Sequence, residues 1–286
     1  MFRLKALVVL VLAVALTFIV VLAGSLHNNA ASETTSTTAG PTTVASSTSS
    51  VSSTSTTVTP TTVLAARRHY TVLEIGDSLG TDLGGGLGHQ LATSPRVTLV
   101  QKGKSETGLA NAWFYDWPQH LKTYLAQYHP QLLIVLLGGN DEQSMDVDHH
   151  AAAFDTPTWR TQYAKNVRVM MREATKANCS VLWVGMPIMY PNYYREGMKV
   201  INSIFANVAS ATPRVTFLST WKYMANRQGQ FQFSAWVNGS YEALRSADGI
   251  HPTAVGQNVL ATYVVQQMHT IYRLPVTPAF PMFFSR

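Results

Sequence analysis

The sequence predicts a three-layer α/β/α fold built on a five-stranded parallel sheet. Short apolar segments alternate with longer segments of helical periodicity, and five such apolar segments occur along the chain. The third of them, residues 131–137, is apolar at nearly every position. A strand that is apolar on both faces is typical of a parallel sheet covered by helices on each side. The alternation of strand and helix favours right-handed crossovers between neighbouring strands.

The expected elements follow one another in a regular order. Strands are expected at residues 70–76, 96–100, 131–137, 180–186 and 214–218. Helices are expected at residues 79–92, 117–128, 158–176, 193–210 and 253–271. Residues 221–241 are too long for a simple connection and predict a lid or hairpin. Three prolines after residue 274 predict an irregular tail.

Two segments before this alternation account for an unusual composition. The chain has 286 residues, of which 46% are hydrophobic and 13% are charged, against roughly a quarter charged in an average globular domain. Residues 1–24 hold one long apolar run, and 22 of the 31 residues from 32 to 62 are Ser or Thr. Without these segments, residues 67–286 remain as one domain.

The apolar run predicts a membrane segment or a signal peptide. Residues 6–24 carry no charge and would span roughly 28 Å as a helix, close to the ~30 Å hydrocarbon core of a bilayer. Small residues around Ala23 also suit signal cleavage. Arg3 and Lys5 precede the run, so the rest of the chain is expected outside the cytoplasm. We therefore expect a single-pass membrane protein with an extracytoplasmic domain, or a secreted protein if residues 1–24 are cleaved.

Other features of composition limit the partners. Residues 25–66, rich in Ser and Thr, predict a disordered linker. Cys179 is the only cysteine, so it forms no intrachain disulfide and is expected to be a small buried residue. The net charge is +6, but no Lys/Arg run occurs, which argues against nucleic-acid binding.

The loop after the first strand contains a candidate nucleophile. Ser78 lies in the sequence Gly-Asp-Ser-Leu at a tight strand-to-helix turn. Such a turn exposes the hydroxyl group and places the backbone N–H of Ser78 at a helix N-terminus, where it stabilises an oxyanion. The alternative is that Ser78 only caps the helix.

A candidate base and its partner lie close together near the C-terminus. Asp248 and His251 share one loop immediately before the last helix. At this spacing the carboxylate can hold one ring nitrogen while the other faces a serine. The alternative is an ordinary loop aspartate beside a solvated histidine.

The loop after the third strand contains a candidate oxyanion donor. Asn140 follows two glycines, and its side-chain amide can donate to a developing oxyanion. The alternative is an asparagine that tolerates a left-handed turn. The loop after the second strand, around Gly108, could add a backbone N–H.

Three tetrapeptides now amount to a resemblance to a known family. The sequences GDSL at 76–79, GGND at 138–141 and DGIH at 248–251 resemble blocks one, three and five of the SGNH, or GDSL, hydrolases. The resemblance covers residues 70–271 and implies a flavodoxin-like sheet of order 2-1-3-4-5, with esterase chemistry that needs no metal or other cofactor. It implies Ser78 as nucleophile, His251 as base and Asp248 as its orienting partner. Asn140 and the Ser78 N–H would form the oxyanion hole.

The second block departs from the family pattern. Residues 105–108 read Ser-Glu-Thr-Gly, where the family usually has a Gly-Asp-Thr-like turn. Gly108 is our candidate for the remaining oxyanion-hole donor. Residues 107–109, 115–118 and 244–245 resemble an uncharacterised bacterial cell-envelope branch of the family, whose relatives are associated with O-acyl groups on surface polysaccharides.

Two further residues are candidates for substrate binding. Trp113 belongs to an aromatic cluster at residues 113–117 that could stack on sugar rings or simply pack in the core. Arg245 could bind an acidic substrate group or form a surface ion pair. The acidic and histidine residues of the loop 146–150 have no spacing typical of a metal site, so we expect no metal.

These observations predict an extracytoplasmic serine esterase or O-acyltransferase. The predicted location and the family resemblance imply that its substrate is an ester-linked acyl group, specifically O-acetyl, on a cell-envelope polysaccharide. The expected intermediate is an acyl-serine. A lipid or thioester acyl hydrolase is the alternative among enzymes. The alternative of another class is a non-catalytic glycan-binding module on a membrane stalk.

Overall fold

The computed structural model describes residues 63–190, 192–282 and 284–285. The predicted anchor or signal peptide and nearly all of the predicted linker lie outside these residues. Within the described part of the chain, no helix has the length and apolar character needed to cross a membrane.

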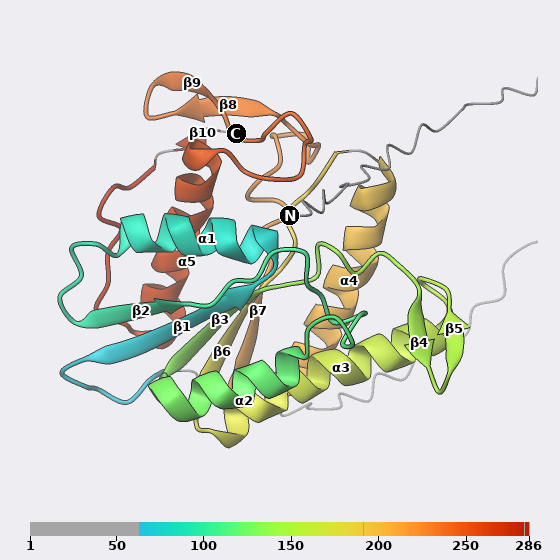
Figure 1. Cartoon of the computed structure of the whole chain (residues 1–286). Helices are drawn as coiled ribbons and strands as arrows, with labels where there is room; N and C mark the ends of the chain where they lie inside the picture. The colour runs from blue at the N-terminus through green and yellow to red at the C-terminus, as the bar shows by residue number, and fades with distance from the viewer. Residues whose placement is uncertain (1–62, 191, 283, 286) are drawn as a thin grey trace, which may run out of the picture. The chain divides into compact units, whose positions relative to one another are not determined.

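A five-stranded parallel sheet forms the centre of the domain, in the order β2-β1-β3-β6-β7 (Figure 1). In chain order this is 2-1-3-4-5, as the family resemblance implies. The predicted fold class is therefore confirmed. The strands are β1 (Tyr70–Gly76), β2 (Val97–Gln101), β3 (Leu132–Leu136), β6 (Ser180–Val184) and β7 (Val215–Leu218).

Helices cover both faces of this sheet. The first and last helices, α1 and α5, pack together on one face, and the other three cover the opposite face (Figure 1). Every predicted helix and central strand lies within two residues of its observed bounds. The helices are α1 (Ser78–Gln90), α2 (Trp117–Tyr128), α3 (Pro157–Lys176), α4 (Asn192–Ser210) and α5 (Ala254–Tyr272).

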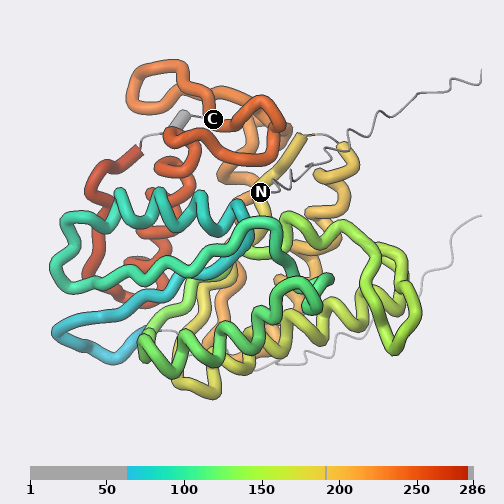
Figure 2. The backbone as a smooth tube through the Cα atoms, viewed as in Figure 1, coloured from blue at the N-terminus to red at the C-terminus, as the bar shows by residue number. Residues whose placement is uncertain are grey.

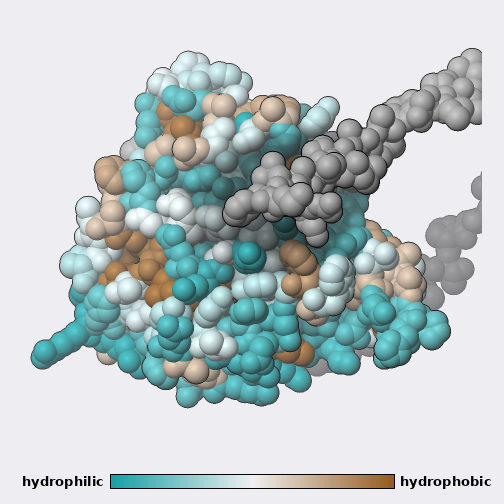
Figure 3. Space-filling model, viewed as in Figure 1, coloured by the Kyte–Doolittle hydropathy of each residue, from teal (hydrophilic) through white to brown (hydrophobic). Residues whose placement is uncertain are grey.

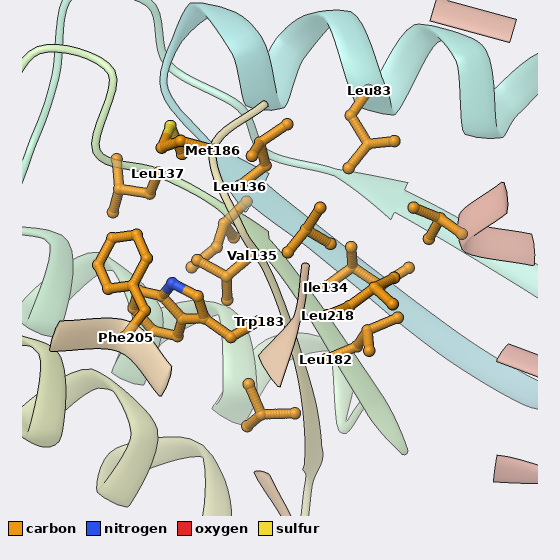
Figure 4. Packing of buried hydrophobic residues seen from close by; sticks show 14 of the residues in the cluster. Leu83, Ile134, Val135, Leu136, Leu137, Leu182, Trp183, Met186, Phe205 and Leu218 are labelled. Carbon is orange, nitrogen blue, oxygen red and sulfur yellow. The ribbon is translucent and has the colours of Figure 1, made fainter. Parts of the chain in front are cut away.

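The core lies between the sheet and these helices. All five residues of β3 are buried, which agrees with its apolar sequence. On the face covered by α4, the rings of Trp183 and Phe205 pack with their centroids 5.0 Å apart (Figure 4). The surface seen in Figure 3 is mostly hydrophilic, with hydrophobic residues in small patches. Apolar burial between the layers therefore fixes the sheet and the loops at its ends.

Two hairpins extend this core at separate places on the molecule, and one short strand joins the second of them (Figure 2). The hairpin of β4 (Met145–Val147) and β5 (His150–Ala152) was not expected. The hairpin of β8 (Ser234–Val237) and β9 (Ser240–Ala243) agrees with the hairpin prediction for this region. β10 (Phe284–Ser285) pairs with β8, so the tail is not irregular throughout, because its end completes the edge of this small sheet.

Candidate active site

The turn from β1 to α1 places Ser78 at the first residue of the helix. Gly76 is required there by close packing, since a Cβ atom on it would lie 2.0 Å from the carbonyl oxygen of Leu136. Asp77 is the helix N-cap, and its Oδ1 atom accepts a hydrogen bond from the Leu79 N–H at 2.9 Å. The interpretation of Ser78 as the cap is therefore wrong. The serine hydroxyl is left for another partner.

That partner is His251. Its Nε2 atom lies 2.9 Å from the Oγ atom of Ser78, and its Nδ1 atom lies 2.7 Å from Oδ2 of Asp248. With a proton on Nδ1, the ring donates to the aspartate and accepts from the serine hydroxyl. The structure thus brings together all three residues that the sequence proposed as nucleophile, base and orienting partner.

The loop before α5 holds Asp248 and His251 in this arrangement. The second carboxylate oxygen of Asp248 accepts hydrogen bonds from the backbone N–H groups of Ile250 and His251, at 2.8 and 3.0 Å. Gly249 has a φ of +68°, which favours glycine at this turn. Partial burial raises the pKa of Asp248, but the hydrogen bonds from the His251 ring and the two amides outweigh it and hold this pKa below its ordinary value. The carboxylate is therefore ionised at neutral pH.

Two of the candidate oxyanion donors, Asn140 and Gly108, lie close to each other. One hydrogen of the Asn140 side-chain amide is donated to the Thr107 carbonyl, with an N–O distance of 2.8 Å. An amide NH₂ group carries a second hydrogen that can point to a substrate. Gly108 follows Thr107 and lines the same cavity as Asn140. The loops after β2 and β3 therefore converge at this cavity, and the role of Asn140 and Gly108 as oxyanion donors stays a prediction.

Two buried aspartates, which received no role from the sequence, tie these loops together. Oδ2 of Asp77 accepts hydrogen bonds from the N–H groups of Gly138 and Gly139 at 2.9 and 2.7 Å, linking the Ser78 turn to the loop after β3. Burial raises the pKa of Asp77 to about 6, and the amides of Gly138 and Gly139 offset part of the effect.

Asp141 makes the corresponding link to the loop after β2. Its carboxylate accepts hydrogen bonds from the N–H groups of Leu109 and Ala110 and from the hydroxyl of Tyr163, at 3.0, 2.9 and 2.7 Å. A Cβ atom on Gly108 would lie 2.0 Å from Oδ1 of Asp141. Both aspartates lie inside the GDSL and GGND motifs, but motif position alone does not say which amides a carboxylate accepts from.

The two candidates for substrate binding, Trp113 and Arg245, differ in their exposure to solvent. Trp113 is 83% exposed and lines a cavity of about 490 Å³ beside Asn140, whereas Trp117 is fully buried, so the aromatic cluster is divided between surface and core. Arg245 is only 5% exposed and donates to the Ile188 carbonyl at 3.5 Å. It is not the surface ion-pair partner considered as one alternative. Its role in substrate binding stays a prediction.

Cys179 and the possible metal ligands form no further reactive site among the described residues. Cys179 is buried as expected, and burial raises its pKa to about 12, so its thiol is not a nucleophile at neutral pH. In residues 63–190, 192–282 and 284–285, no three His, Cys, Asp or Glu side chains gather where they could hold a metal ion.

The sheet order and the loops at its carboxyl end define the class: this is a protein with the SGNH hydrolase fold. The structure is similar to a GDSL-like lipase from Bacteroides thetaiotaomicron, with a TM-score of 0.50 and 16% identity over 73% of this chain and 92% of that one. It is also similar to a candidate acylhydrolase from Bacteroides fragilis, with a TM-score of 0.52 and 12% identity over 73% and 91%. At these identities the likeness concerns the fold.

The sequence itself gives the family. The chain belongs to the family described as "Protein of unknown function (DUF459)", whose model matches residues 71–267. A search of curated proteins gives no match to this chain.

Proposed function

We propose that this protein is a serine esterase or acyltransferase that forms an acyl-Ser78 intermediate. The observation that carries the proposal is the 2.9 Å contact between Nε2 of His251 and Oγ of Ser78, with Asp248 on the other ring nitrogen. A nucleophile, a base and an orienting carboxylate in hydrogen-bond contact are the arrangement that acyl transfer needs. The names of the two structural neighbours, a GDSL-like lipase and a candidate acylhydrolase, agree with ester chemistry.

The reaction follows from these contacts. His251 takes the hydroxyl proton as Oγ of Ser78 attacks the ester carbonyl, and Asp248 stabilises the resulting imidazolium. The Ser78 N–H, the Asn140 amide and the Gly108 N–H donate to the tetrahedral oxyanion. The carbon–oxygen bond to the alcohol then breaks, and His251 returns its proton to the leaving oxygen. Water or a second alcohol attacks acyl-Ser78 by the same route and restores the serine.

The proposed substrate is an O-acyl group, specifically O-acetyl, on a cell-envelope polysaccharide. Two observations support it: the sequence resembles the envelope branch of the SGNH hydrolases, and residues 1–24 predict an anchor or signal peptide that would place the domain outside the cytoplasm. We propose a single-pass membrane location, or secretion if these residues are cleaved. Acyl transfer to a sugar hydroxyl in place of water fits the same intermediate.

Labelling and turnover test this proposal together. The full chain and its Ser78→Ala variant are incubated with a serine-reactive fluorophosphonate and with p-nitrophenyl acetate. We expect labelling and release of p-nitrophenol from the parent and neither from the variant. Equal signals from both proteins would exclude Ser78 as nucleophile. A parent that neither reacts nor turns over would favour the non-catalytic glycan-binding module.

A second set of substrates separates the kinds of enzyme. Acetylated wall glycans, fatty-acyl esters and acyl thioesters are compared by kcat/KM, with free acetate and acetyl transfer to sugar measured separately. Preference for the glycan supports the proposed substrate, and preference for a fatty-acyl ester or thioester would replace it. Release of acetate without transfer would reject the transferase version.

A further inference from the structure

A cavity of about 490 Å³ opens directly beside the oxyanion donors. Gly108 and Asn140, the two residues proposed as oxyanion donors beside the Ser78 N–H, form part of its wall. If they act in that way, an ester bound at Ser78 has its carbonyl oxygen at the edge of this cavity. A substituent only a few bonds from the reacting carbonyl can therefore enter the cavity. Under the proposed function, we expect the occupant to be part of the substrate or of the acceptor alcohol.

Aromatic side chains from two distant segments line this cavity. Trp113 and Phe114 come from the loop after β2, and Tyr193 and Tyr194 come from the first turn of α4. Trp113 is 83% exposed and Tyr193 is 62% exposed. Large aromatic surfaces held open to solvent beside a reaction site are typical of ligand binding.

The charge of the cavity is opposite to that of the chain. Glu106 and Glu142 line it, and among the described residues no Lys, Arg or His does so, although the whole chain carries +6. Anionic groups such as phosphates and uronates are disfavoured here by repulsion from the two carboxylates. The occupant is therefore neutral or cationic.

The surroundings of Glu142 favour a cationic occupant over a neutral one. Its Oε2 atom is buried and has no hydrogen-bond partner among the described residues. The side chain packs against α4, where a Cβ atom on Gly197 would lie 2.2 Å from Oε2. Burial raises the pKa of Glu142. The pKa of Tyr194 is also raised, by burial first, then by Tyr193 and then by Glu142, so the carboxyl group acts on this tyrosine. Among the described residues, Glu142 thus lies beside the aromatic wall without a compensating positive charge. A cation in the cavity would offset the cost of ionising this side chain, whereas a neutral group would not.

Carboxylates and aromatic ring faces attract the same kind of group. The face of an aromatic ring carries negative potential and binds ammonium ions, and quaternary ammonium groups bind in cages of such rings. We propose that this cavity binds a positively charged amine of the acyl-ester substrate, close to the ester bond. The inference rests on the proposed esterase function, and it narrows the substrate to esters that carry an amine, such as those of amino sugars or amino alcohols.

Two esters of the same shape and different charge test the proposal. Acetylcholine and 3,3-dimethylbutyl acetate differ only in a quaternary nitrogen in place of a quaternary carbon. We expect the full chain to prefer acetylcholine by about tenfold in kcat/KM, which corresponds to 1.4 kcal/mol. A ratio of one, or a preference for the neutral ester, would overturn the proposal and favour a neutral sugar in the cavity.

Variants assign the preference to this cavity. Glu142→Gln and Trp113→Ala are each expected to move the ratio of the two kcat/KM values toward one; Trp113 is exposed, so its loss leaves the core intact. Glu196→Gln removes the same charge from α4 at an exposed residue that pairs with Lys199 outside the cavity, and should keep the wild-type ratio. A ratio that falls equally in Glu196→Gln would mean that general charge, not the cavity, sets the preference.

The same measurements distinguish a failure of the amine site from a failure of the esterase proposal. Ser78-dependent hydrolysis without any charge preference leaves the esterase proposal standing and rejects the amine. If neither ester turns over, the rate of fluorophosphonate labelling of Ser78 is measured with and without millimolar choline. Protection that Glu142→Gln abolishes supports the amine site, and labelling unaffected by choline rejects it. Absence of labelling altogether rejects the esterase proposal itself.

Discussion

The Nε2 atom of His251 lies 2.9 Å from the Oγ atom of Ser78, although 173 positions separate the two residues in the chain. The contact exists because β1 ends at the same edge of the sheet as the loop that precedes α5. Asp77 strengthens it by capping α1, which leaves the Ser78 hydroxyl free of that task. The two residues are therefore expected to work as one unit.

Substitution of either residue should abolish activity to a similar extent. We expect Ser78→Ala and His251→Ala each to lower kcat on p-nitrophenyl acetate by at least ~10³-fold, and the double variant to be no slower than either. Steady-state kinetics with thermal unfolding as a control for folding provides the measurement. Effects that multiply in the double variant would show that the two side chains act independently.

Loss of the Asn140 amide should slow the chemical step. We expect Asn140→Ala to lower kcat by about 10²–10³-fold with a small change in KM, because the amide is proposed to donate to the oxyanion and only weakly to the bound ester. Pre-steady-state acylation rates check this. A variant that changes KM alone would place Asn140 in ground-state binding instead.

The backbone at Gly108 should not tolerate a side chain. Gly108→Ala places Cβ 2.0 Å from a carboxylate oxygen of Asp141, so the loop must shift and both kcat and stability should fall. Gly85→Ala is the matched control, because its Cβ would meet its nearest neighbour, Oε1 of Gln257, at 3.5 Å. In the middle of α1 this change should stabilise by up to ~1 kcal/mol. Equal behaviour of the two variants in kinetics and urea unfolding would contradict the close packing at Gly108.

Asp141 should contribute to stability through the three hydrogen bonds it accepts. In Asp141→Asn one oxygen becomes an NH₂ group, which leaves a buried donor facing another donor, and we expect a loss of about 1–3 kcal/mol in the free energy of unfolding. Tyr163→Phe removes only the hydroxyl partner and should cost less. Urea denaturation gives both values. An unchanged midpoint for Asp141→Asn would mean that the loop does not depend on this carboxylate.

Glu74 should make stability depend on pH. It is fully buried in β1, and burial raises its pKa from an ordinary 4.5 to about 8, with the nearby amides of Lys102 and Gly103 offsetting part of the effect. Between these values the folded protein keeps a proton that the unfolded chain releases, so the free energy of unfolding falls as pH rises. The fall attributable to Glu74 is on the order of 5 kcal/mol.

The Glu74→Gln variant isolates this effect. Its side chain does not titrate, so the slope of the free energy of unfolding against pH should be shallower between pH 4.5 and 8 than in the parent. Asp77, whose pKa is raised to about 6, still contributes the same sign of slope at the lower end of the window. Identical slopes in parent and variant would show that Glu74 is not protonated in the folded state.

Much of the fold could be predicted because its signals are local. The apolar strand at 132–136 and the periodic helices give both the type and the order of the elements within a few residues. The site residues in the three motifs could be proposed because parallel strands bring their carboxyl ends to one edge. The short hairpin at 145–152 was missed because its two strands have only three residues each.

The supporting residues depend on tertiary packing and gave no local signal. Asp77 and Asp141 are polar residues in motifs, and only the folded loops show which amides they accept from. Arg245 looks like a surface residue in sequence, yet its backbone pairs with Pro252 and its side chain is buried. Tyr193 and Glu142 reach one cavity because α4 packs beside the loop after β3.

The most direct test of the account is to find where the acyl group goes. The protein is mixed with p-nitrophenyl acetate, quenched in acid within the first turnover, digested and analysed by peptide mass spectrometry. We predict an acetyl group on Ser78 that accumulates in the parent and is absent from Ser78→Ala. Acetylation at another residue would contradict the proposed acyl-serine mechanism. Turnover that leaves Ser78 of the parent unmodified, and that is equally fast in Ser78→Ala, would contradict it as well.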